Sequence, residues 1–113
     1  MIDPELLGQH RQELRRGTVV LACLLALQTP GYGYGLLKTL ETAGIPSDAN
    51  TIYPLLRRLE ERGLLNSEWN TDDTRPRKFY RTSPAGGAMA SQLMSDMAQL
   101  TASLHTLNEG DAR

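Results

Sequence analysis

A stripe of leucine and methionine side chains near the end of the 113-residue chain is the strongest constraint on the fold. Its members recur every three or four residues, like the seam of a coiled coil: Met89, Leu93, Met97, Leu100, Leu104 and Leu107. Ser83 and Pro84 form a helix start before the stripe, which predicts one helix over residues 84–108. Roughly 25 helical residues span about 37 Å, more than the width of a small domain. Part of the stripe therefore needs a second surface, and we expect a second copy of the chain to supply it.

The size and composition of the chain are those of one small globular domain. It has 113 residues, of which 40% are apolar and 22% charged, so most multi-domain enzymes are excluded. Its single cysteine, Cys23, cannot form an internal disulfide, and no secretory leader pattern opens the chain, so we expect a cytoplasmic protein. The longest apolar run, residues 19–27, is about half as long as a membrane span and predicts a buried helix.

Basic residues are unevenly distributed along the chain. The net charge is −1, which gives no overall attraction to nucleic acid. Residues 9–84, however, hold eleven basic and eight acidic side chains, and residues 75–81 hold four basic side chains and no acidic one. A local basic stripe suits short-range contact with a polyanion better than long-range steering of the whole protein.

Hydrophobic spacing predicts three helical segments before this basic stripe. Asp3 and Pro4 begin a first helix, which is loosened at Gly17 and continues as an apolar helix to residue 29. A second helix follows over residues 33–43, and a third runs from residue 47 or 48 to residue 62. The third helix has one apolar face at i, i+3, i+4 and i+7, made by Ile52, Leu55, Leu56 and Leu59. Pro54 lacks the amide that would bond to Asn50, so the first turn of this helix could be distorted, or the regular helix could start as late as Asn50.

After residue 65 the hydrophobic period changes from helical to two. Residues 67–70 and 77–82 read as short strands, and the polar segment between them reads as a projecting turn. Trp69, Phe79 and Leu65 are able to face the helices, and we expect Trp69 to be hydrophobic filling under this hairpin.

The predicted fold class is mainly α with a small β-hairpin. Three helices followed by a basic hairpin give the order of a winged helix-turn-helix, here with a C-terminal dimerisation helix. The predicted division is an N-terminal helical extension (1–16), a winged helix DNA-binding domain (17–83), a dimerisation helix (84–108) and a frayed tail (109–113). In such a domain the third helix enters the major groove, and the hairpin, or wing, contacts the backbone or the minor groove.

A string on the third helix resembles a known family. It reads Thr51-Ile52-Tyr53-Pro54-Leu55-Leu56, followed by Leu59-Glu60 and Gly63-Leu64, and it resembles the PadR family of bacterial transcriptional regulators. Supporting matches are Arg16-Gly17, Gly33-Tyr34, Trp69, Arg77-Lys78-x-Tyr80 and Ser83-x-x-Gly86, so the resemblance covers about residues 15–104. The short last helix is similar to that of the compact subgroup, whose members dimerise through it and mostly repress transcription. Asn50 stands where the family often has glycine and could alter base preference, and Thr82-Ser83 replaces a usual Leu-Thr.

The candidate DNA contacts lie at the second helix, the third helix and the wing. They are Tyr34, Asn50, Thr51, Tyr53, Pro54, Arg57, Arg58, Arg75, Arg77 and Lys78. Arg57 and Arg58 would meet phosphate or a guanine edge, and the wing cations would bind phosphates. The plainer interpretation of the helix is a solvated face whose arginines pair with Glu60 and Glu61. Tyr53 could equally be a half-buried core residue.

These residues favour a homodimeric repressor that binds a palindromic operator in double-stranded DNA and is released by a small-molecule or stress signal. A cavity between subunits, lined by Met89, Leu93, Met97 and residues of the first helix, could admit an apolar effector. The alternative is a winged-helix module for protein–protein interaction without DNA binding. We expect no enzyme, membrane, cofactor or metal function, because metal-spaced ligands, a nucleophile motif and paired carboxylates are missing from the sequence. His10 and His105 could meet across a dimer at a ligand or metal site, but exposed or packed histidines are the commoner outcome, and Cys23 reads as a small core residue.

Overall fold

The computed structural model describes residues 1–72 and 74–110, so residues 111–113 of the predicted frayed tail lie outside the described residues. The elements, in chain order, are α1 (Pro4–Arg16), α2 (Thr18–Ala26), β1 (Gly31–Tyr32), α3 (Gly33–Thr42), α4 (Ala49–Glu61), β2 (Leu65–Asn70), β3 (Arg77–Thr82) and α5 (Pro84–Asn108). The fold is mainly helical with a small antiparallel sheet, as the sequence predicted.

Capping side chains begin the helices where the sequence placed them. The Asp3 carboxylate accepts a hydrogen bond from the Glu5 amide at 3.0 Å, and Asp48 accepts one from the Thr51 amide at 2.8 Å. The apolar helix α2 ends at Ala26, three residues before the predicted end. Pro30 has no amide hydrogen to donate to the Ala26 carbonyl, so the helical ladder cannot continue.

The helix α4 is continuous through Pro54, with no separate distorted first turn. It begins at Ala49, so Pro54 lies in the second turn and only the Asn50 carbonyl loses its helical partner. The helix stops where Gly63 adopts a left-handed conformation with φ of 77°.

The sheet has the strand order β1-β3-β2, and both pairings are antiparallel. The sequence did not predict β1, which consists of two residues and is too short to show an alternating pattern. Trp69 is 64% exposed, so the prediction that it fills space under the wing is wrong. Trp69 pairs with Lys78. This pair lies two residues closer to the tip of the hairpin than the pair of Ser67 with the buried Tyr80, and at that distance the helices no longer cover the sheet.

Phe79 does not face the helices either. Neighbouring side chains in a strand point to opposite faces of a sheet, and the face directed to the helices is taken by Tyr80. Phe79 packs edge-on against Tyr32 of β1, with ring centroids 6.0 Å apart. The error for Phe79 therefore comes from the choice of strand face, whereas Trp69 lies on the same face as Tyr80 and is exposed because the helices do not extend that far along the wing.

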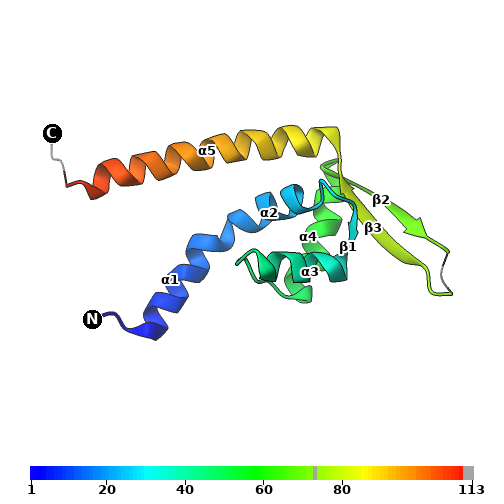
Figure 1. Cartoon of the computed structure of the whole chain (residues 1–113), viewed down its shortest axis with the longest axis horizontal. Coiled ribbons are helices and arrows are strands. Elements are labelled where there is room, and N and C mark those ends of the chain that lie inside the picture. The colour runs from blue at the N-terminus through cyan, green and yellow to red at the C-terminus, as the bar shows by residue number, and fades with distance from the viewer. Residues whose placement is uncertain (73, 111–113) are drawn as a thin grey trace.

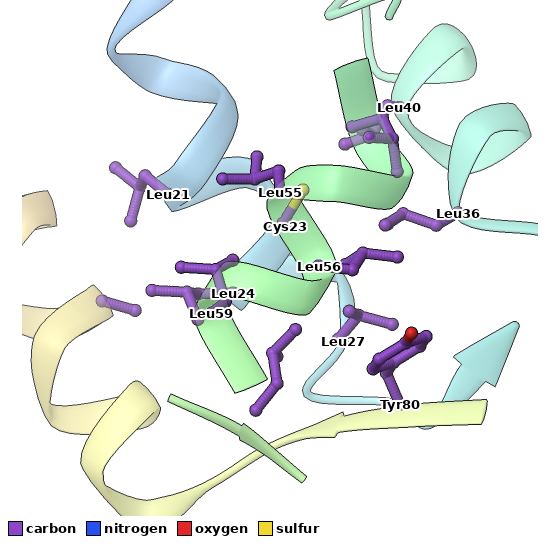
Figure 2. Packing of buried hydrophobic residues seen from close by; sticks show 13 residues of the cluster. Leu21, Cys23, Leu24, Leu27, Leu36, Leu40, Leu55, Leu56, Leu59 and Tyr80 are labelled. Carbon is purple, nitrogen blue, oxygen red and sulfur yellow. The ribbon is translucent and has the colours of Figure 1, made fainter. Parts of the chain in front are cut away.

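The core lies where α2, α3 and α4 meet the end of β3 and the start of α5. Figure 2 shows leucines of these helices and the Tyr80 ring directed into one cluster. Ser83 is buried at the start of α5, where its hydroxyl donates to the Gly63 carbonyl at 2.6 Å and accepts from the Gly86 amide at 3.0 Å.

Both ends of the chain extend away from the wing. The molecule measures 62 × 32 × 21 Å, and α1 and α5 run toward the end opposite the hairpin of β2 and β3 (Figure 1). Among the described residues, α1 contributes no buried side chain. Beyond its first two turns, which pack through Gly86 and Ala90, α5 is mostly exposed along its length.

Candidate nucleic-acid interface

The helix α4 has one buried face and one polar exposed face. Its four apolar side chains, Ile52, Leu55, Leu56 and Leu59, are all buried, as the spacing predicted. The side chains of Asn50, Thr51, Arg57 and Arg58 are exposed. A helix advances 100° per residue, so Asn50, Pro54 and Arg57 lie at the centre of the exposed face, opposite the core.

The two flanks of this exposed face meet different parts of the molecule. Thr51 and Arg58 lie on the flank directed toward α1, where they line a groove with residues of that helix. Tyr53 and Glu60 lie on the other flank, directed toward α3 and the wing. The exposed centre of α4 is therefore bordered by structure on both sides.

Tyr53 fits both interpretations that the sequence left open. Its ring packs so closely on Gly33 that a Cβ at that glycine would lie 2.4 Å from the tyrosine Cε1. The residue is nevertheless 41% exposed, which leaves part of it open to solvent beside the polar face of α4. Tyr34, at the first turn of α3, is 78% exposed. Gly33 thus permits the close contact between α3 and the Tyr53 ring of α4.

An ion pair joins the wing to the last turn of α4. The Lys78 ammonium lies 3.0 Å from a Glu60 carboxylate oxygen, and the Ser67 hydroxyl donates a hydrogen bond to the other. The hydrogen bond from Ser67 and the ion pair with Lys78 outweigh burial and lower the pKa of Glu60. The hydrogen bond to Glu60 in turn raises the pKa of Lys78.

This contact differs from the plain pairing considered for the sequence, in which Glu60 neutralises the arginines of its own helix. Glu60 instead pairs with a strand that is distant in the sequence, so no local spacing could have indicated it. Within the described chain no ion pair joins Glu60 to Arg57 or Arg58. Lys78 is therefore engaged inside the protein, and its role as a phosphate ligand stays a prediction.

A second wing cation, Arg77, lies over an aromatic ring, which the sequence did not reveal. The Arg77 guanidinium lies over the Tyr32 ring, 4.7 Å from its centroid, and the Asn70 side-chain amide donates to the Tyr32 hydroxyl at 2.6 Å. These contacts join the Tyr32 side chain of the edge strand β1 to the wing, on the sheet face opposite to Lys78. Arg75 is exposed in the segment between β2 and β3.

The predicted seam of α5 divides into two parts. Leu93 packs against the core of its own chain. Leu100 and Leu104 are each 61% exposed, and Met97 and Leu107 are exposed as well. This leaves an unpartnered apolar stripe on the distal half of α5, and α1 also exposes Leu6 and Leu14.

The described residues offer little support for a metal site, a reactive thiol or a membrane span. The described residues contain no cluster of three side chains suited to bind a metal ion, and His10 and His105 are both exposed. The Cys23 thiol is buried, and this burial raises its pKa to about 11. Among the described residues we also find no helix with the length and apolarity needed to cross a bilayer.

Comparisons with known proteins agree with this geometry. The model of the transcriptional regulator PadR-like family matches residues 20–92. Transcriptional regulator Rv3488 of Mycobacterium tuberculosis is 38% identical over 82 residues, which cover 72% of this chain and 77% of that protein. The crystal structure of a PadR family transcriptional regulator from Eggerthella lenta matches with a TM-score of 0.89 and 43% identity, covering 93% of this chain and 94% of that one. A PadR-like transcription factor from Bacteroides fragilis matches with a TM-score of 0.74 and 26% identity, covering 88% and 98%.

Proposed function

Since the chain belongs to the PadR-like family of transcriptional regulators, we propose that it is a homodimeric repressor that binds a palindromic DNA operator. This is a family of regulators and not of enzymes, and its solved members share the winged helix fold. The observation that carries the proposal is the polar exposed face of α4, with cations and hydrogen-bonding groups opposite a fully buried apolar face.

In the proposed complex, α4 lies in the major groove. Asn50 and Thr51, in its first turn, are placed to hydrogen-bond with base edges, and Arg57 is placed to meet a guanine edge or a phosphate. Tyr34 and Tyr53 border the same face from the side of α3 and reach the neighbouring backbone. Arg75 and Arg77 of the wing bind phosphates beside the groove, which set the register without reading the sequence. Residues 17–83 thus form the DNA-binding unit.

The proposed dimer forms through α5, residues 84–108, with help from α1. The exposed apolar stripe of α5 supports this, because a second copy would remove these side chains from water. A two-fold axis then presents one α4 to each half of a palindrome, with half-sites about 10 base pairs apart or at a multiple of that spacing.

Release of the operator by a signal completes the proposal. Met89 and Met97 are exposed on α5 and Leu93 lies between them along the helix, so a cavity between paired α5 helices would be lined by these three side chains. Such a cavity suits an apolar small molecule.

DNA binding is tested on the DNA upstream of the protein's own gene, by fluorescence anisotropy over a range of salt concentrations. We expect Arg57→Ala and Arg58→Ala each to weaken binding by about tenfold. If a substitution removes one phosphate contact per subunit, the slope of log affinity against log salt should flatten by about 1.8 for the dimer. Arg11→Ala, on the exposed surface of α1, is the matched control. Unchanged affinity and slope in both α4 variants would refute the assignment and favour a protein-binding module.

The dimer is tested by sedimentation. We expect the double variant Leu100→Asp and Leu104→Asp to be monomeric, because paired helices would bury four added charges. The control is Ser95→Asp with Thr106→Asp, which adds the same charges on another face of α5. A monomeric wild type at micromolar concentration would refute the proposed dimer.

A further inference from the structure

Trp69 is the only tryptophan of the chain, and the fold leaves it outside the hydrophobic core. Its side chain is largely exposed near the tip of the wing. An indole combines a large apolar surface with one N–H donor, and tryptophan is enriched where proteins meet their partners. The surroundings of Trp69, more than its exposure, indicate which partner it meets.

Trp69 projects from the face of the wing that is directed toward α4. Ser67 and Trp69 are two residues apart in β2, so their side chains lie on the same face of the sheet. The Ser67 hydroxyl donates a hydrogen bond to the Glu60 carboxylate, which places this face beside the last turns of α4. Trp69 lies about 7 Å farther along the strand, where the hairpin stands clear of the helices (Figure 1). The indole therefore borders the space between the wing and α4.

The same side of the wing holds little free charge next to Trp69. Its direct partner across the strands is Lys78, which is paired with Glu60 at 3.0 Å. Arg77 and Arg81 project from the opposite face, because side chains alternate along β3. This alternation divides the basic stripe of the sequence between two faces. The side toward α4 presents an indole beside a neutralised ion pair.

We propose that Trp69 contacts the DNA backbone, with its indole ring packed on deoxyribose sugars of the strand that passes between the wing and α4. This step rests on the proposed function, in which α4 lies in the major groove and the wing lies beside it. Each backbone strand separates the major groove from the minor groove, so one strand runs between these two elements. The apolar ring and the neutralised pair suit an uncharged sugar, and the indole N–H can donate to a neighbouring phosphate.

A second copy of the chain is the other candidate to cover this surface. The proposed dimer does not use it, because Leu100 and Leu104 lie on the distal half of α5, which runs away from the hairpin (Figure 1). The surface around Trp69 instead adjoins α4 through the contacts of Ser67 and Lys78 with Glu60. It is therefore continuous with the proposed DNA interface.

Contact with a sugar differs in two measurable ways from contact between a cation and a phosphate. It releases no counterion, so it does not contribute to the salt dependence of binding. Sugars are also the same at every base pair, so the contact strengthens binding to the operator and to unrelated DNA by the same factor. Trp69 thus adds affinity and fixes the position of the wing without reading the sequence.

Tryptophan fluorescence tests the contact directly, because Trp69 is the only such residue in the chain. The full chain is quenched with acrylamide, first alone and then with a saturating duplex from the DNA upstream of its own gene. We expect strong quenching of the free protein and loss of most of this quenching in the complex. Protection that is already present without DNA would show that protein covers Trp69 and would overturn the proposal. DNA binding with unchanged quenching would refute this contact alone, whereas the absence of any DNA binding would refute the proposed function together with it.

Variants at the same position measure what the ring contributes. Fluorescence anisotropy should show Trp69→Ala binding the upstream duplex and an unrelated duplex about tenfold more weakly, with an unchanged salt slope. Trp69→Phe keeps an apolar ring and should retain most of the affinity. Asn66→Ala, exposed on the opposite face of β2, is the control and should bind like wild type. Urea unfolding verifies that each variant is folded. Wild-type affinity of Trp69→Ala, or a flattened salt slope, would overturn the proposal.

Discussion

Replacing Gly86 by alanine tests how tightly α5 is joined to the winged domain. A Cβ at this position would lie 2.1 Å from the Leu64 carbonyl oxygen and 2.8 Å from Thr82 Cγ2. The carbonyl cannot easily retreat, because it accepts the Ser83 amide at 3.1 Å while the Ser83 hydroxyl accepts the Gly86 amide. Overpacking costs up to about 3 kcal/mol and a lost cap about 1 kcal/mol, while alanine regains about 1 kcal/mol of helix propensity. We expect a net loss of about 3 kcal/mol in the free energy of unfolding.

Gly87 supplies the matched control within the same turn. A Cβ there would meet nothing within 4 Å, so Gly87→Ala should gain about 0.5 kcal/mol from helix propensity alone. Urea unfolding of both variants and wild type gives the comparison, at one protein concentration because the stability of a dimer depends on it. If Gly86→Ala proves as stable as Gly87→Ala, the close contact with the Leu64 carbonyl does not hold α5 in place.

Three further predictions concern single side chains. Because the pKa of Glu60 is lowered in the fold, its contribution to stability is complete at neutral pH and is lost as the pH falls below its ordinary value of 4.5. Urea unfolding at neutral pH and at about pH 4 should therefore show a smaller acid effect in Glu60→Gln than in wild type, and identical pH dependence would contradict this. The Cys23 thiol, with its pKa raised to about 11, should react slowly with a chromogenic thiol reagent in the native protein and quickly in urea, so fast native reaction would show an accessible thiol. Gly33→Ala should displace the Tyr53 ring and weaken DNA binding, which ring NMR signals and anisotropy can measure; an unmoved ring would refute the close contact.

The helices could be predicted because their signals are local. The buried face of α4 follows from side chains within two turns of one another, and Asp3 and Ser83 cap helices through amides two or three residues away. The predicted helix over residues 84–108 has the same bounds as α5.

The sheet could not be predicted in the same way. The side-chain direction reverses at every residue of a strand, so an apolar residue does not by itself say which face the core covers. Trp69 and Phe79 are the most apolar aromatic residues of the hairpin, yet the buried aromatic ring is that of Tyr80. How far the helices extend along the wing depends on tertiary packing, and the exposure of Trp69 follows from that.

The sequence identified the candidate cations but not the contacts that orient them. The ion pair of Lys78 with Glu60 and the stacking of Arg77 on Tyr32 join residues far apart in the chain. The groove that residues of α1 and α4 line together likewise depends on where α1 lies relative to α4, which no local sequence pattern indicates. Residue type and local spacing indicated the candidate residues of the site. The contacts that determine their charge interactions could be identified only from the folded structure.

The joint between α4 and α5 explains how dimer geometry can control DNA recognition in the proposed repressor. Within three residues of the end of α4, the Gly63 and Leu64 carbonyls accept hydrogen bonds from the hydroxyl and amide of Ser83, which caps α5. The helices α4 and α5 are thus connected across a few hydrogen bonds, although β2 and β3 separate them in the sequence. A change in the angle between paired α5 helices would therefore pass directly to the spacing of the two α4 helices. Because half-sites must match the pitch of DNA, a small change at the dimer interface is enough to lower operator affinity.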